Sequence, residues 1–155
     1  MPLLKDGRIV ADAWRTVDLD APLPDGGPVV VPAARWRRDR VALSERPGEL
    51  GLGLPNTEDI AALKDDLDRF ALIALQFPKF NDGRAYSQAR LLRERYGWRG
   101  ELRATGQVLR DQLLFMHRAG FDSFEIAHSD PEAAWRAALS EISVFYQPTG
   151  RSAAR

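Results

Sequence analysis

A chain of 155 residues with 45% hydrophobic and 28% charged side chains is expected to form one soluble globular domain with a hydrophobic core. Its 22 basic and 22 acidic residues cancel, which argues against bulk nucleic-acid binding, and no apolar run is long enough to span a membrane. The lack of cysteine excludes disulfides, a thiol nucleophile and a thiolate-held iron–sulfur cluster in this chain. Lys5 is not followed by the apolar segment of a signal peptide, so we expect a cytoplasmic location.

Residues 1–48 are expected to form a short β-rich N-terminal segment. The predicted strands are Ile9–Trp14, Val29–Pro32 and Arg35–Leu43. The third strand contains the most basic stretch of the chain, Arg35–Arg40. We interpret these charges as those of an edge strand that resists edge-to-edge pairing. The alternative is a docking patch for an acidic partner or a nucleic acid, with Trp36 as its aromatic anchor.

Residues 49–146 alternate between apolar runs and amphipathic stretches, which predicts a β/α core domain. The predicted strands are Leu50–Leu54, Ala71–Phe77, Glu101–Thr105 and Phe121–Ile126. Helices are expected near residues 57–70, 83–96, 107–119 and 130–145. The fold class is therefore α/β, with four parallel β/α units joined by right-handed crossovers. Residues 147–155 are expected to be a flexible tail.

The strand at Glu101–Thr105 bears on two possible architectures, an open sheet covered on both faces and a sheet curved like half of a barrel. Leu102 and Ala104 share one face of this strand, while Arg103 lies on the other. A doubly covered sheet would bury Arg103 at a high cost, whereas the inner face of a half-barrel can use it. That open face would need a lid from residues 1–48 or a partner, and we expect a homodimer.

The loop after the second core strand is the leading candidate for a binding site. The residues predicted to bind a ligand are Lys79, Asn81, Asp82 and Arg84 from this loop, together with Arg103. Loops at the carboxyl ends of parallel strands share one edge of a sheet, and helices starting at Gly83 and Gln107 would direct backbone N–H groups toward a compact oxyanion or a phosphate. The alternative is a turn capped by Asp82, with its cations in solvent.

Arg103 has a second interpretation, in which it forms an internal ion pair with Glu101, Glu125 or Asp122. The helix face that carries Tyr86, Arg90 and Arg93 is interpreted as solvated surface. No metal site is predicted, because the two histidines, His117 and His128, cannot form a conventional zinc site by themselves. Gly51-Leu52-Gly53 lacks the third glycine of a dinucleotide fingerprint, so no cofactor is predicted from a motif.

Several segments together resemble one bacterial domain family of unknown function. They are Leu54–Asn56, Phe77–Arg84, Ser87–Leu92, Gly100–Gly106, Arg110–Leu113 and Ala119–Phe124. The resemblance covers roughly residues 48–146, and its most specific parts are the Asp-Gly-Arg loop and the Gly-Glu-Leu-Arg strand. The family is often labelled an oxidoreductase involved in sulfite reduction, because its genes lie beside sulfite reductase and other sulfate-assimilation genes.

The resemblance implies a pathway and leaves the reaction open. It implies an accessory protein of assimilatory sulfite reduction that binds an anionic ligand or a pathway enzyme, such as sulfite reductase. The alternative that it implies is an oxidoreductase of the same pathway with a borrowed flavin or nicotinamide cofactor. The family carries no established catalytic residues to transfer, so the catalytic residues and the cofactor stay unassigned at this point.

Overall fold

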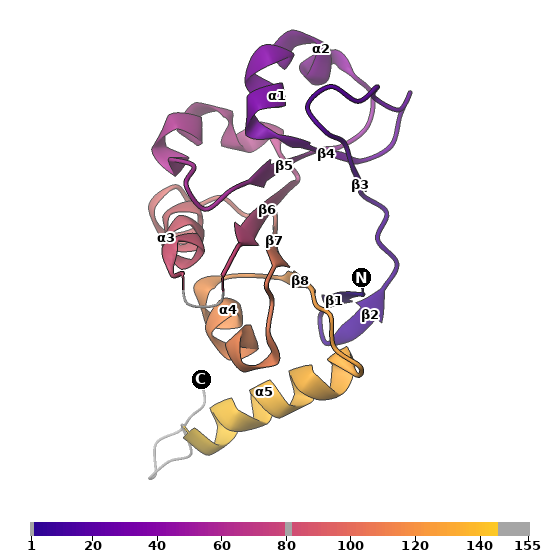
Figure 1. Cartoon of the computed structure of the whole chain (residues 1–155). Helices are drawn as coiled ribbons and strands as arrows, with labels where there is room; N and C mark the ends of the chain where they lie inside the picture. The colour runs from indigo at the N-terminus through magenta and orange to yellow at the C-terminus, as the bar shows by residue number, and fades with distance from the viewer. Residues whose placement is uncertain (1, 80–81, 146–155) are drawn as a thin grey trace.

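The computed structural model describes residues 2–79 and 82–145, and their strands form one curled sheet (Figure 1). The strands are β1 (Leu3–Lys5), β2 (Arg8–Val10), β3 (Arg15–Thr16), β4 (Val29–Pro32), β5 (Leu50–Leu54), β6 (Leu72–Phe77), β7 (Glu101–Gly106) and β8 (Ser123–Glu125). Their order across the sheet is β2-β1-β8-β7-β6-β5-β4-β3, and β3 through β8 run parallel. The α/β class is confirmed, and of the two architectures that the sequence left open the structure has the sheet curved like half of a barrel.

Helical segments connect the neighbouring parallel strands from β4 to β8, and one more helix follows β8. They are α1 (Ala33–Arg38), α2 (Arg40–Glu45), the 3₁₀ segment η1 (Ile60–Arg69), α3 (Arg84–Arg90), the π turn η2 (Leu91–Arg95), the short 3₁₀ turn η3 (Arg110–Gln112), α4 (Leu113–Ala119) and α5 (Pro131–Phe145). When consecutive parallel strands are neighbours, crossovers of one hand place every connection on the same face. Figure 1 shows α1, α3 and α4 on one side of the sheet. The repeat is less regular than predicted, because one of its helices is entirely 3₁₀.

The hydrophobic core lies between the sheet and these helices. Alternate residues of the central strands are buried there, among them Leu52, Leu54, Ile73, Leu75, Phe77, Leu102 and Ala104. The helices contribute Ala85, Ala89, Leu92, Leu113 and Met116 to the same core. Burial of a Leu, Ile or Phe side chain stabilises a fold by roughly 1.5–3 kcal/mol. As predicted, Leu102 and Ala104 are in this core, and Arg103 lies on the opposite face of β7.

The predicted strand at Arg35–Leu43 is wrong, because this stretch forms α1 and α2. Strands β4 and β5 are parallel neighbours, so the chain between them has to return along the sheet, and helices make that return. Trp36 is fully buried, and its Nε1 donates to Asp66 Oδ2 over 3.1 Å. Trp36 therefore cannot be the exposed anchor of a docking patch, and the edge-strand interpretation fails with the strand.

The N-terminal segment is part of the same sheet. Strand β1 pairs antiparallel with β8 at one end, while β3 and β4 extend the parallel strands at the other. The chain between β2 and β3 runs along the side of the sheet opposite to the helices (Figure 1). Its Trp14 packs against Val30, Leu72 and Ala74 of the open face. This segment covers part of the concave face that the sequence analysis expected to need a lid.

Candidate functional site

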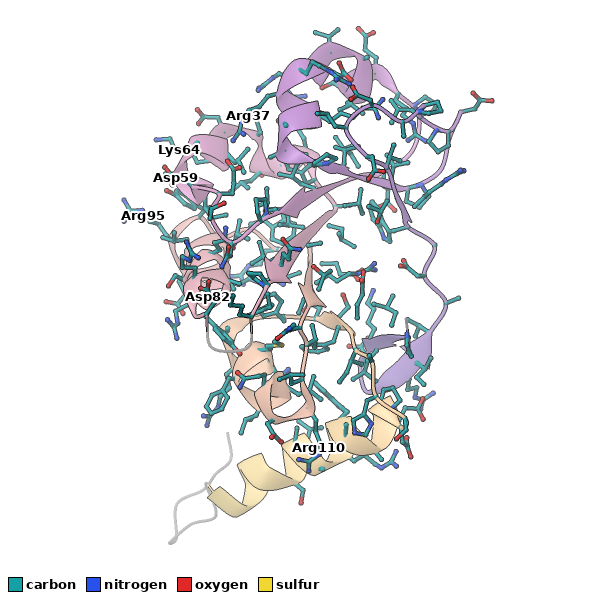
Figure 2. All side chains as sticks on the ribbon, viewed as in Figure 1. Arg37, Asp59, Lys64, Asp82, Arg95 and Arg110 are labelled. Carbon is teal, nitrogen blue, oxygen red and sulfur yellow. The ribbon has the colours of Figure 1, made fainter. Side chains whose placement is uncertain are left out.

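In the predicted loop after β6, the charged groups bind one another. Asp82 Oδ1 accepts the backbone N–H of Arg84 over 3.1 Å, and Oδ2 accepts its guanidinium over 2.8 Å. Asn56 Nδ2 also donates to Asp82 Oδ2, at 2.8 Å. The hydrogen bonds from Arg84 hold the pKa of Asp82 far below its usual range. Lys79 is exposed, Asn81 lies outside the described residues, and Asp82 is on the helix-bearing side (Figure 2).

The expected pair of helix N-termini at this edge is not formed. No helix begins at Gln107; its backbone N–H donates to Phe77 O over 2.7 Å, and the next helical turn starts at Arg110. Gly106 makes this close approach possible, because it has a φ of 85° and a Cβ there would lie 2.5 Å from Phe77 O. At the other end, the first N–H of α3 is already bonded to Asp82.

Arg103 belongs to an ion-pair cluster on the concave face. Its exposed fraction is 3%, and its Nη1 donates to the two oxygens of Asp12 over 3.1 and 3.2 Å. Nη2 donates to Glu101 Oε2 over 3.2 Å, and Glu125 Oε2 lies 3.7 Å from Nη1. The internal ion-pair interpretation therefore describes Arg103, with Asp12 as a partner that the sequence analysis missed. Arg84 and Arg103 both pair with carboxylates, and a ligand shared between Arg103 and the loop stays a prediction.

Glu101 is the best-partnered carboxylate of this cluster. Lys5 Nζ donates to Glu101 Oε1 over 2.9 Å, and Ser123 Oγ donates to Oε2 over 2.8 Å. Burial pushes the pKa of Glu101 upward, but the hydrogen bonds from Lys5, Ser123 and Arg103 outweigh burial and lower it. The cluster is thus stable with Glu101 ionised, which ties β1, β7 and β8 together.

Arg93 and Asp122 form a separate structural contact. Asp122 was one expected partner of Arg103, but its Oδ2 instead accepts Arg93 Nη2 over 2.6 Å and the backbone N–H of Leu102 over 2.9 Å. Arg93 also donates to the carbonyl oxygens of Trp98, Gly100 and Gly120. This arginine is half-buried and holds η2 against two loops, so its expected place on a solvated face is wrong.

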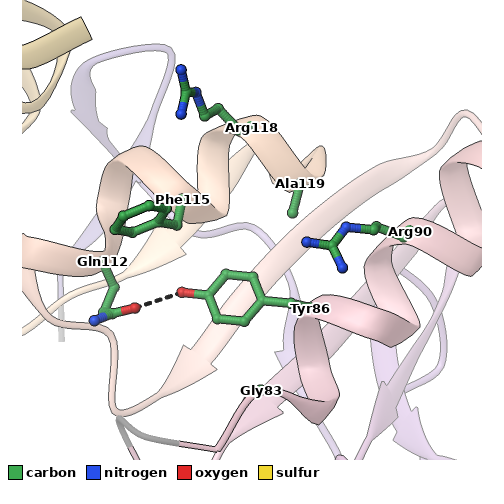
Figure 3. A pocket seen from close by; sticks show the side chains of 7 residues that line it. All are labelled: Gly83, Tyr86, Arg90, Gln112, Phe115, Arg118 and Ala119. Carbon is green, nitrogen blue, oxygen red and sulfur yellow. Dashed lines mark hydrogen bonds between the residues drawn. The ribbon is translucent and has the colours of Figure 1, made fainter. Parts of the chain in front are cut away.

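A cavity between α3 and α4 lies directly beside the predicted loop (Figure 3). Its volume is about 500 Å³, and we call it the α3–α4 cavity. It is lined by Gly83, Tyr86, Arg90, Gln112, Phe115, Arg118 and Ala119, none of which is acidic. Gly83 brings the end of the predicted loop to its wall.

Polar groups in the α3–α4 cavity are oriented by a half-buried hydrogen bond. Tyr86 Oη donates to Gln112 Oε1 over 2.8 Å. Burial raises the pKa of Tyr86 to about 12, so the phenol keeps its proton at neutral pH. This contact fixes the amide of Gln112, whose nitrogen faces away from Tyr86, and Arg90 extends from α3 toward α4 (Figure 3). The cavity therefore offers a guanidinium and an amide donor, the groups that bind carboxylate, sulfate or phosphate.

This cavity was not predicted from the sequence, although the sequence contains part of its signal. Tyr86 and Arg90 are four residues apart, so they share a helix face. That face was interpreted as solvated because the sequence does not reveal that α4 packs beside α3. The exposed ring of Phe115, with an exposed fraction of 55%, adds an apolar surface to the same cavity.

No group of three or more His, Asp or Glu side chains that could hold a metal ion is found in residues 2–79 and 82–145. The two histidines have other contacts: the His117 ring packs edge-on against Trp135 at 5.1 Å between centroids, and His128 Nδ1 accepts the backbone N–H of Asp130 over 2.9 Å. In the same ranges, no helix is long and apolar enough to cross a membrane.

Comparison with known proteins gives one result. The family model described as bacterial protein of unknown function (DUF934) matches residues 51–154. No curated protein and no solved structure matches the chain significantly. The matched range begins in β5, so it includes the predicted loop, the α3–α4 cavity and β7, but not Asp12.

Proposed function

The chain belongs to the DUF934 family of bacterial proteins of unknown function, and from this premise we propose that it is an accessory protein of assimilatory sulfite reduction. In this proposal it binds an anionic group, carried by a small ligand or by a pathway enzyme, in the α3–α4 cavity. The pathway comes from the resemblance of the loop and strand segments, and a cytoplasmic location is part of the same proposal. The binding role comes from the cavity.

The observation that supports anion binding is the composition of the cavity wall. Arg90 and Gln112 supply donors, Tyr86 holds Gln112 in place, and no lining residue is acidic. A hydrogen bond to a charged group contributes about 1.5–3 kcal/mol. Two such bonds from Arg90 are enough for weak binding of a free oxyanion, and a larger ligand would gain more from the ring of Phe115.

Binding of sulfite, sulfate and phosphate to the purified protein tests this proposal. We expect saturable heat in calorimetry and a loss of affinity of at least about tenfold in Arg90→Ala. Arg38→Ala is the matched control, because Arg38 lies on α1 and pairs with Asp20 on the surface. Sulfate also acts on many proteins without a site, by exclusion from their surface. Equal heats and affinities in Arg90→Ala and Arg38→Ala would therefore refute a specific site.

A pull-down from sulfate-limited cells tests the partner. We expect recovery of sulfite reductase or another sulfate-assimilation enzyme by the intact protein and its loss with Arg90→Ala. Failure to recover any such enzyme, together with no anion binding, would refute the accessory role. Oxidation of NADPH by the protein in the presence of sulfite would instead support the oxidoreductase alternative.

Association into a homodimer is also a proposal. Three large apolar side chains remain exposed on elements that contact one another, namely Leu109 before η3, Phe115 on α4 and Leu139 on α5. Exposed apolar surface of this kind is typical of interaction sites. Light scattering at high micromolar concentration should give twice the monomer mass, and Phe115→Glu should reduce it to the monomer mass; a monomer for the unchanged protein would refute the proposal.

A further inference from the structure

A second cavity lies on the concave face of the sheet, at the carboxyl ends of the parallel strands, and it is distinct from the α3–α4 cavity. Its volume is about 360 Å³. It is lined by Thr16, Val30, Gly53, Leu54, Pro55, Ala74, Gln76, Arg103, Thr105 and Glu125, and we call it the concave-face cavity. In α/β folds the carboxyl ends of the strands are where ligands bind, because loops and strand ends from several units converge there.

Glu125 is the carboxylate of the ion-pair cluster with the weakest partner. The described residues of the cluster supply two cations, Lys5 and Arg103, and three carboxylates. Lys5 is bound to Glu101, and Arg103 donates to Glu101 and Asp12. Among residues 2–79 and 82–145, Glu125 has only the 3.7 Å approach to Arg103, which is longer than a hydrogen bond. Its side chain is 32% exposed and lines the cavity.

The remaining wall is uncharged. Thr16, Gln76 and Thr105 place hydroxyl and amide groups around the cavity, while Val30, Ala74 and Pro55 provide apolar surface. An anion is disfavoured here, because the guanidinium of Arg103 is already shared among carboxylates. A ligand with a positive charge and N–H donors would supply Glu125 with the hydrogen bonds that the cluster does not.

We propose that the concave-face cavity binds a small organic ammonium ion. The ammonium group pairs with Glu125, and its other N–H groups donate to the oxygens of Gln76 and Thr105. A short hydrocarbon stem contacts Val30, Ala74 and Pro55. The site is independent of the anion-binding α3–α4 cavity, which lies on the helix-bearing side of the sheet.

Gly53 provides a direct way to close the cavity. A Cβ at this position would lie 3.5 Å from Val30 Cγ1 and 3.9 Å from Val31 O, both ordinary contact distances. The backbone can therefore accept a side chain at position 53, and valine is also favourable in a strand. Gly53→Val should fill the cavity and leave the sheet intact.

Titration of n-butylammonium chloride, followed by amide chemical shifts in the full-length protein, tests the proposal. We expect saturable shifts at Gln76, Thr105 and Glu125 with a millimolar dissociation constant, and no saturable shifts with sodium butyrate or n-butanol at the same concentrations. Glu125→Gln removes the charge and should weaken binding by about tenfold or more. Gly53→Val should abolish it; if that variant does not fold, Gly53→Ala takes its place and should weaken binding.

The outcomes separate this site from the anion site. Arg90→Ala should leave butylammonium binding unchanged, and Gly53→Val should leave sulfite binding to the α3–α4 cavity unchanged. The proposal is overturned if butylammonium gives no saturable shifts, if butyrate or butanol binds equally well, or if binding persists unchanged in Glu125→Gln. Loss of sulfite binding alone would refute only the function proposed for the α3–α4 cavity.

Discussion

Replacement of Arg103 by methionine is the sharpest test of the concave-face ion-pair cluster. Methionine keeps much of the length and apolar contact of the arginine but removes the charge that Asp12, Glu101 and Glu125 share. Removal of one partner of a buried ion pair costs about 3–5 kcal/mol, because the opposite charges are left uncompensated. The lower end applies here, since Asp12 and Glu125 are 37% and 32% exposed and Glu101 keeps Lys5. We therefore expect a loss of about 3 kcal/mol.

Urea unfolding at neutral pH measures this loss, and in a thermal melt it corresponds to a decrease in Tm of about 6–12 °C for a domain of this size. Arg38→Met is the control, because Arg38 and Asp20 have exposed fractions of 46% and 83% in their side chains. Exposed pairs of this kind often contribute nothing measurable. Equal stabilities of Arg103→Met, Arg38→Met and the unchanged protein would refute the assignment of Arg103 as a structural cation.

Four further predictions concern individual residues. Burial raises the pKa of Glu125 above its value in the unfolded chain, so the free energy of unfolding falls as the pH rises through the folded pKa. In urea unfolding, Glu125→Gln should therefore be more stable than the unchanged protein at neutral pH and equally stable below the unfolded pKa. Gly106→Ala should lower the free energy of unfolding by more than about 2 kcal/mol, because its Cβ would clash with the backbone of Phe77. Gly97→Ala has a φ of 64° and open space around its Cβ, so it should lower this free energy by about 1 kcal/mol, and equal losses would contradict the clash. Arg93→Lys should cost about 2 kcal/mol in the same assay, since an ammonium cannot reproduce five donor contacts of the guanidinium, and an unchanged midpoint would contradict this. In an ultraviolet titration, the phenolate component near pH 12 should disappear in Tyr86→Phe, and an unaltered titration curve would argue against burial of this phenol.

The parallel strands of the core could be predicted because their signal is local. The apolar runs that became β5 and β6 are bounded by turn residues, and the alternation in β7 correctly separated Arg103 from the buried Leu102. The helices α1 and α2 could not be recognised in the same way. Trp36 is flanked by arginines, which by themselves indicate neither a helix nor a strand, and the need for a helical return arises only once β4 and β5 are known to be adjacent.

The candidate site was harder to predict, because its charges are neutralised by residues that are distant in the sequence. Asp12 is 91 residues away from Arg103, so no spacing rule could have paired them. Asp82 is close to Arg84, but Asn56, 26 residues earlier, also donates to it. Arg84 and Arg103 therefore pair with carboxylates once the chain folds, while the wall of the α3–α4 cavity comes from two helices that are separate in the sequence.

The antiparallel pairing of β1 with β8 has a consequence for the order of folding. Two of the contacts that hold β1, Leu4 opposite Phe124 in the sheet and Lys5 with Glu101, join residues that are far apart in the sequence. During synthesis β1 can pair with β2 at once, but this hairpin cannot join the sheet until β8 has left the ribosome. Contacts between such distant residues carry a large loop-closure entropy and slow folding. The β1–β2 hairpin is thus expected to join the sheet late, and β1 covers the edge of β8 that would otherwise stay open to another chain.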